Sequence, residues 1–136
     1  NILLAGVRRA RIRYELPCQR AYREAEVRLM GDYYAAASAE FRHKIERELA
    51  DGFRAYLPKN QTVREQFEQL LNSRIPLGVL TDILAFTMHL ELRVKQQLLH
   101  QVNVDRRAVT LLERLRQAQQ EPAPPRCRFP PEFSEN

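Results

Sequence analysis

The sequence has few of the residues that mark several common classes of protein. Its 136 residues contain no tryptophan, four glycines and two cysteines. The glycines are isolated and none precedes a Lys-Ser or Lys-Thr pair, so there is no glycine-rich loop for a nucleotide phosphate. Cys18 and Cys127 have no short spacing that predicts a disulfide or a zinc motif. Two such thiols favour a reducing compartment, and we expect the cytoplasm.

Long apolar runs are also missing. The most apolar stretch, residues 75–92, is interrupted by proline, aspartate, histidine and glutamate, far short of the roughly 20 apolar residues that span a bilayer. No membrane contact is predicted. The amino terminus has no basic region and no methionine, so it resembles neither a signal peptide nor a natural start. We expect a cut into a longer chain.

Groups that perform catalysis are scattered. His43, His89 and His100 fall in three different predicted helices, and none stands four residues from another histidine or a cysteine, as a helical metal site requires. The serines have no local base to activate them. We therefore expect no enzyme activity, no cofactor and no metal site.

Positive charge is concentrated near the start of the chain. The formal net charge is +5, and residues 1–30 contain seven arginines against three glutamates. Arg8, Arg9, Arg11 and Arg13 form a candidate basic patch that would attract nucleic acid or an acidic protein. We favour a simpler interpretation, in which these arginines form the solvated face of a strand and pair with glutamates across the ladder.

The first 30 residues predict an antiparallel hairpin. Residues 7–14 alternate between arginines and an apolar face that we expect to be half-buried, made of Ala10, Ile12 and Tyr14. Residues 21–29 repeat the alternation weakly, and residues 16–19 supply the turn. Because two strands alone are marginal in water, the hairpin is predicted to be the remnant of a larger sheet or barrel.

Helical periodicity follows after residue 32. The first predicted helix covers about 22 residues up to Pro58, with an apolar stripe at Ala37, Phe41, Ile45, Leu49, Phe53 and Leu57. The second begins with Thr62 as N-cap and Glu65 in a capping box. The third opens with Pro76 as its first helical residue and runs to about Met88.

Two more helices and a tail complete the prediction. The fourth helix spans about 91–101, and the fifth runs from Asn103 or Asp105 to the glutamine-rich segment at 117–120. Five of the eight prolines lie in residues 121–136, which predicts an extended tail. Asp82 lies between apolar residues of the third helix, and we expect Lys95, Gln96 or a backbone amide to be its donor.

Several segments resemble the N-terminal domain of Lon proteases. Residues 80–85, Leu-Thr-Asp-Ile-Leu-Ala, followed by Lys95-Gln96, Val104 and Arg107, are similar to the family's L-A-D-x-I-A, K-Q and D-V-x-x-R-L motifs without a gap. Residues 6–12, Gly-Val-Arg-Arg-Ala-Arg-Ile, resemble its G-x-x-R-A-R-I strand. Residues 25–27, Ala-Glu-Val, resemble its next strand. The resemblance covers about residues 6–116.

The chain departs from the family pattern in places. Ile75 stands where the family has aspartate, Thr81 replaces alanine, Asn103 replaces an acidic residue and Ala108 replaces leucine. The family's opening strands are absent before Asn1, and prolines after residue 121 end the helix that a complete Lon protease would continue. The resemblance therefore implies a stand-alone Lon-domain protein or a fragment of one.

The implied fold is α+β with three parts. Residues 1–30 would be a hairpin left from a PUA-like β-barrel, residues 31–120 a five-helix bundle and residues 121–136 a proline-rich tail. The resemblance implies a non-catalytic module for substrate recognition or an adaptor linked to ATP-dependent proteolysis. Its partners would be unfolded or damaged proteins and a Lon-type ATPase or protease. Because some PUA-like folds bind RNA, single-stranded nucleic-acid binding through the hairpin stays as the alternative.

A protein-interaction module needs an accessible apolar groove. The candidate residues are Phe86, Met88 and Leu90 at the junction of the third and fourth helices, together with Tyr33 and Tyr34 near the hairpin. All five are also compatible with ordinary core packing. Nucleic-acid binding is less favoured, because single-strand readers usually place exposed aromatics among their arginines and only Tyr14 and Tyr22 are nearby.

Overall fold

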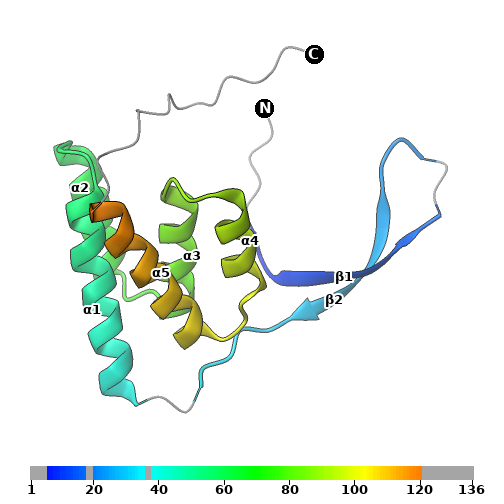
Figure 1. The fold of residues 1–136 in the computed structure, drawn as a ribbon, viewed down its shortest axis with the longest axis horizontal. Helices are drawn as coiled ribbons and strands as arrows, with labels where there is room; N and C mark the ends of the chain where they lie inside the picture. Colours follow the sequence, from blue (N-terminus) through cyan, green and yellow to red (C-terminus); the bar gives the residue numbers. More distant parts are fainter. Residues whose placement is uncertain (1–5, 18–19, 36–37, 121–136) are drawn as a thin grey trace.

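A computed structural model describes residues 6–17, 20–35 and 38–120. Within this part, the strands β1 (Arg9–Leu16) and β2 (Glu24–Met30) precede the helices α1 (Ala39–Tyr56), α2 (Gln61–Asn72), α3 (Leu77–Thr87), α4 (Leu92–His100) and α5 (Val104–Gln120). The helices gather together, and the hairpin projects from them to one side (Figure 1). The predicted α+β order is confirmed. The predicted tail, 121–136, lies outside the described residues.

The hairpin is antiparallel, as predicted, but its ladder contains a β-bulge. Ile12 pairs with Val27, whereas Tyr14 pairs with Glu26, so Arg13 is the extra residue. A bulge moves every later side chain of its strand to the other face of the sheet. Tyr14 therefore leaves the apolar face expected for it, and its hydroxyl donates a hydrogen bond to Glu26.

The apolar face of the hairpin is not covered. Ile12 is 62% exposed and Leu29 58% exposed, so the expected half-burial of this face is wrong within the described residues. The reason is the geometry of the chain, because the hairpin leaves the bundle and no helix packs across it (Figure 1). A face of this kind is typical of a sheet that needs further strands.

Three helices begin at residues other than those predicted. Ser38 caps α1 by accepting a hydrogen bond from the Phe41 amide, so this helix has 18 residues and starts later than expected. Asn60, and not Thr62, caps α2 through a bond from the Val63 amide. Asparagine is among the strongest N-cap residues, which explains its preference over the predicted capping box. Pro76 precedes the first helical residue of α3.

The core lies where α5 packs between α1 and α3. Its fully buried side chains include Leu49 of α1, Leu80 and Leu84 of α3, and Leu111 and Leu115 of α5. Phe41, predicted to share this stripe, is exposed because it lies in the first turn of α1, before the stretch that packs against the core. None of the described helices is long and apolar enough to cross a membrane.

Backbone hydrogen bonds hold the segment after the hairpin against the bundle. The Tyr33 amide donates to the Val102 carbonyl, and the Val104 amide donates to the Tyr33 carbonyl, each at 3.0 Å. The two bonds form a single parallel bridge between Tyr33 and Asn103. The bridge fixes the neighbouring residue, Asp32, beside the first turns of α3 and α5.

Candidate functional site

The structure separates the residues predicted to bind protein. Phe86 is 82% exposed at the end of α3, and the Lys95 ammonium lies over its ring. Met88 is only 1% exposed, because it follows the last turn of α3 and its side chain packs into the core. The expectation that Met88 lines an accessible groove is therefore wrong. Leu90 is partly buried against the same core.

Tyr33 and Tyr34 belong to a different surface. Both rings are exposed, and the Arg42 guanidinium lies 5.1 Å from the centre of the Tyr34 ring. Asp32, next to Tyr33, contacts the first turn of α3, whereas Phe86 is in the last turn, about 12 Å further along at 1.5 Å per residue. The candidate residues therefore do not form one groove, and the binding role of the exposed ones stays a prediction.

The candidate basic patch is divided as well. Arg13 Nη1 donates to Glu26 Oε1 at 2.6 Å, which confirms cross-strand pairing with glutamate for this residue. Arg9 turns toward the helices, where two aspartates neutralise it. Arg8 and Arg11 have no ion pair among the residues that the structure describes. The four arginines are therefore not a continuous surface of free cations.

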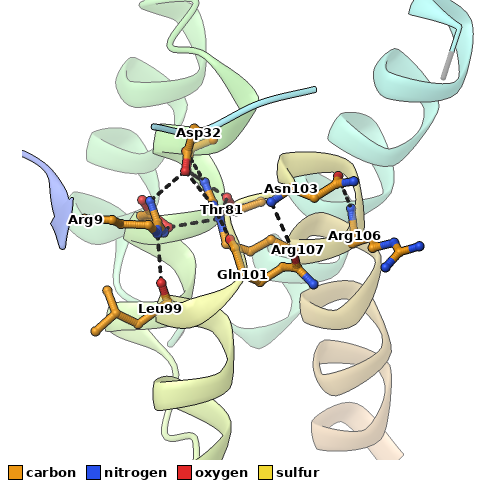
Figure 2. A network of polar contacts seen from close by, with 10 residues as sticks. Arg9, Asp32, Thr81, Leu99, Gln101, Asn103, Arg106 and Arg107 are labelled. Atoms are coloured by element: carbon orange, nitrogen blue, oxygen red, sulfur yellow. Dashed lines mark hydrogen bonds and ion pairs between the residues drawn. The ribbon is translucent and has the colours of Figure 1, made fainter. Parts of the chain in front are cut away.

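A network of charged side chains joins the hairpin to α3 and α5 (Figure 2). We call it the arginine network; it consists of Arg9, Asp32, Thr81, Asp82 and Arg107. The Arg107 side chain is fully buried. Its Nη1 and Nη2 donate to the two oxygens of Asp32 at 3.1 and 2.5 Å, and its Nε donates to Thr81 Oγ1 at 3.2 Å.

Backbone carbonyls also accept hydrogen bonds from both guanidinium groups of the network. Arg107 also donates to the Gln101 carbonyl at 2.7 Å and to the Gly78 carbonyl at 3.3 Å, so all five of its N–H donors have acceptors. Arg9 Nε donates to the Leu99 carbonyl at 3.0 Å. Burial of a guanidinium is tolerated only with such complete pairing, and the network thereby fixes where the hairpin attaches.

Opposing effects act on the pKa of the Asp32 carboxyl. Burial raises this pKa, while the hydrogen bond and charge of Arg107 and the charge of Arg9 lower it. The net result is a pKa below the ordinary value of 3.8. Asp32 is therefore ionised at neutral pH, and its ion pair with Arg107 is intact there.

Asp82 has different partners from those expected. Its Oδ1 accepts a hydrogen bond from Arg9 Nη2 at 2.5 Å and lies 3.2 Å from Arg107 Nε. Lys95 instead donates to the Phe86 carbonyl. The expected pairing with Lys95, Gln96 or a backbone amide is wrong among the described residues, because Arg9 and Arg107 are the partners of the carboxylate and the Lys95 ammonium lies near the end of α3.

Replacing Asp82 with alanine is expected to lower the free energy of unfolding by about 1 kcal/mol. The loss is small because the carboxylate is partly exposed and because Arg9 still has its ion pair with Asp32 in the variant. Urea denaturation measures the change. Asp51→Ala is the control, since it removes a more exposed ion pair with Arg54, for which about 0.5 kcal/mol or less is expected. Equal losses in the two variants would contradict a specific role for Asp82.

An open groove of about 990 Å³ runs along the side of α1. One wall is formed by Tyr34 and by α1 residues between 39 and 54. The other is formed by Leu71 of α2, residues 74–76 of the connection and Leu77 of α3. We call the open groove between these walls the α1 groove. Its apolar residues, besides the Tyr34 ring, are Ala39, Ala50, Leu71, Ile75, Pro76 and Leu77. It includes one of the predicted binding residues, Tyr34, at the end near the start of α1.

Four arginines line the α1 groove, and two of them are neutralised by acids. Arg42 pairs with the buried Asp105 at 2.9 Å, and Arg54 pairs with both Asp51 and Glu68 at 2.6 Å. Arg47 and Arg74 make no ion pair and no side-chain hydrogen bond among the described residues. Glu46 and Asp51 also line the groove, so it combines apolar surface with charged side chains of both signs.

The residues considered for catalysis stay apart. His89 Nδ1 lies 3.1 Å from the Tyr56 hydroxyl, and His43 lies 3.8 Å from Glu46. Within residues 6–17, 20–35 and 38–120, no group of three histidine, cysteine, aspartate or glutamate side chains is placed to hold a metal ion.

Comparison with protein families gives one match. The model of the ATP-dependent protease La (LON) substrate-binding domain matches residues 1–117 of the chain. The chain belongs to the Lon substrate-binding domain family. Comparisons with curated proteins and with solved structures gave no match.

Family membership confirms the resemblance found in the sequence. The matched range includes the hairpin and the first four helices, and it ends within α5. Arg9, Asp82 and Arg107 come from the segments that resemble the Lon domain, and the fold brings all three into the arginine network. These motif residues therefore connect the two parts of the domain.

Proposed function

We infer that the chain is a non-catalytic module that recognises protein substrates, or acts as an adaptor, for ATP-dependent proteolysis of the Lon type. The family supports a substrate-interaction role. The observation that supports a binding site in the described part is the α1 groove, which is large, open and lined partly by apolar side chains. Grooves of this kind accept segments of other proteins.

The occupant in this proposal is an unfolded or damaged protein, and the assembly partner is a Lon-type ATPase or protease. The cytoplasm is the proposed location, since two cysteines without a short spacing suit a reducing compartment. The hairpin is proposed to be part of a larger PUA-like β-domain, because its apolar face is exposed. No feature of the described residues favours nucleic acid as the partner.

The proposal is tested by binding of the full chain to a labelled unfolded protein, such as reduced and carboxymethylated α-lactalbumin, followed by fluorescence anisotropy. Saturable binding is expected. Tyr34→Asp is expected to weaken it about tenfold, equivalent to 1.4 kcal/mol, because the substitution places a charge at the mouth of the apolar groove.

Two other aromatic residues provide comparisons. Tyr22→Asp makes the same change at an exposed position on the hairpin and should leave binding unchanged. Phe86→Asp tests the second predicted surface, and a selective loss there would place the site at the end of α3 instead. Absence of binding to unfolded protein, together with tight and salt-sensitive binding to single-stranded RNA, would contradict the proposed function.

A further inference from the structure

We propose that the polar face of the hairpin binds carboxylate side chains of a protein substrate through Arg11 and Arg28, which we call the arginine pair. This inference rests on the proposed function. It adds to that function a second contact surface, separate from the α1 groove, and acidic residues as the chemical class that this surface recognises.

The register of the hairpin places the arginine pair side by side. Arg11 of β1 and Arg28 of β2 are partners in the ladder, so their exposed side chains leave the same face of the sheet. Ile12 and Val27 form the next pair and therefore lie on the other, apolar face. The arginine pair consequently stays accessible in the larger β-domain proposed above, in which the apolar face is covered.

The two arginines lack a counter-charge of their own. Like charges directly opposite each other destabilise an antiparallel ladder. Neither Arg11 nor Arg28 makes an ion pair or a side-chain hydrogen bond with any residue that the structure describes. A carboxylate has about four acceptor positions, so a single carboxylate can accept hydrogen bonds from both guanidinium groups. Such a ligand would convert the repulsion within the arginine pair into attraction to a shared partner.

The carboxylates of the hairpin and of its attachment are already bound to other arginines. Each glutamate of the described hairpin has one arginine partner: Glu15 pairs with Arg23, Glu24 with Arg20 and Glu26 with Arg13. The two aspartates of the arginine network likewise face its two guanidinium groups. Acids and arginines are therefore equal in number in these contacts, and the arginine pair is left as excess positive charge.

The available cations are confined to one step of the ladder. On one side, the next pair on the polar face is Tyr14 with Glu26, and Arg13 beside them is bound to Glu26. On the other side, Arg9 is bound to Asp32. A nucleic-acid strand carries a phosphate on every nucleotide and needs a row of available cations, whereas an acidic side chain needs only one such position. The arrangement therefore favours an acidic protein segment.

The test uses one labelled unfolded protein in two forms, bound to the full chain and followed by fluorescence anisotropy. Reduced α-lactalbumin is alkylated with iodoacetate, which adds carboxylates at its cysteines, or with iodoacetamide, which adds neutral amides of nearly the same shape. The carboxylate form is expected to bind about threefold to fivefold more tightly, as for ion pairs at exposed positions. The preference should decrease as salt is raised.

Variants assign the preference to the arginine pair. Arg11→Gln combined with Arg28→Gln should remove most of it. Arg93→Gln combined with Arg106→Gln makes the same change in net charge at exposed positions on α4 and α5 and should preserve it. The general attraction between a basic and an acidic protein falls equally in the two variants, so a difference between them reports a specific contact. Circular dichroism verifies that each variant is folded.

Arg11→Glu tests the juxtaposition without any ligand. The new carboxylate would lie opposite Arg28 and replace a repulsion with an ion pair. Amide hydrogen exchange in β2 is therefore expected to slow by about threefold, and the preference for the carboxylate form should disappear. Unchanged or faster exchange would show that the two side chains do not oppose each other, which overturns the inference.

The outcomes distinguish this inference from the proposed function. Equal binding of the two forms, or a preference that survives Arg11→Gln with Arg28→Gln, overturns the inference but leaves the interaction module intact. Tight binding of single-stranded oligouridine that the same variant abolishes would assign the arginine pair to phosphate and overturns it as well. Failure to bind either form of the unfolded protein overturns the inference and the proposed function together.

Discussion

Replacing Arg107 with methionine is expected to lower the free energy of unfolding by about 3–5 kcal/mol, the usual cost of removing one partner of a buried ion pair. The Arg107 side chain is fully buried and donates five hydrogen bonds, two of them to Asp32. Methionine would fill part of the space but would leave Asp32 with Arg9 as its remaining donor and would remove the Arg107 donor from the Gly78 and Gln101 carbonyls. Urea denaturation followed by circular dichroism measures the loss.

Arg106→Met is the matched control for this change. Arg106 is the preceding residue on α5, and its side chain is exposed and points away from the network (Figure 2), so a change below about 0.5 kcal/mol is expected. Arg107→Lys should recover only part of the stability, because an ammonium cannot donate to Asp32 in parallel. Equal stability of the Arg106 and Arg107 variants would show that the network does not stabilise the fold.

The advantage of Arg107 over methionine should depend on pH in a defined direction. The pKa of Asp32 in the folded protein lies below its ordinary value of 3.8, so folding favours the ionised carboxylate. The stability that this ionised carboxylate contributes is fully present above the pKa of Asp32 in the unfolded chain. It is lost as the pH falls through the pKa of Asp32 in the folded protein. The gap between the two proteins should therefore be widest near pH 7 and should narrow below about pH 4.

The order of elements could be predicted because it depends on local patterns. Alternation identified the hairpin, and a period of 3.6 residues identified all five helices, whose buried stripes contain most of the predicted leucines. Helix starts were less predictable. Asn60 and Thr62 are both able to cap a helix. Which one does so depends on the position and direction of the chain after Pro58 and the packed end of α1, and this is not encoded in the local sequence.

The bulge at Arg13 could not be predicted from alternation. The pattern of residues 9–14 is regular, yet the ladder shifts between Ile12 and Tyr14 and places Tyr14 opposite Glu26. A hydrogen bond from the Tyr14 hydroxyl to that glutamate accompanies the shift. Because an exposed hairpin face is not tied to a core, its register depends on such cross-strand pairs rather than on burial.

The residues of the candidate sites were partly visible in the sequence. Arg9, Asp82 and Arg107 stood out through their family resemblance, although nothing in the spacing showed that they meet. Arg47 and Arg74 were not recognised at all. They are 27 positions apart on different elements, and only the packing of the α2–α3 connection beside α1 brings them to one groove.

Gly78→Ala is expected to destabilise the protein by about 1–3 kcal/mol, although alanine is the better residue for a helix by about 1 kcal/mol. A Cβ atom at position 78 would lie 2.9 Å from Asp32 Oδ2 and 3.2 Å from Arg107 Nη2. Both atoms are distal ends of side chains, but they are bonded to each other at 2.5 Å and to other groups, so neither is free to move aside. Thermal denaturation measures the loss.

Two further variants decide whether the arginine network causes the cost of Gly78→Ala. Gly31→Ala makes the same change where no atom lies within 4 Å of the new Cβ, and it should be almost neutral. In the Arg107→Met background, one of the two close atoms is removed and Asp32 is released from its strongest partner. The cost of Gly78→Ala should then fall by more than the roughly 0.5 kcal/mol allowed for independent sites. An undiminished cost in that background would show that α3 approaches α5 closely for reasons unrelated to the network. A Gly78→Ala protein as stable as the original would show that the network yields to the added Cβ and does not hold α3 and α5 close together.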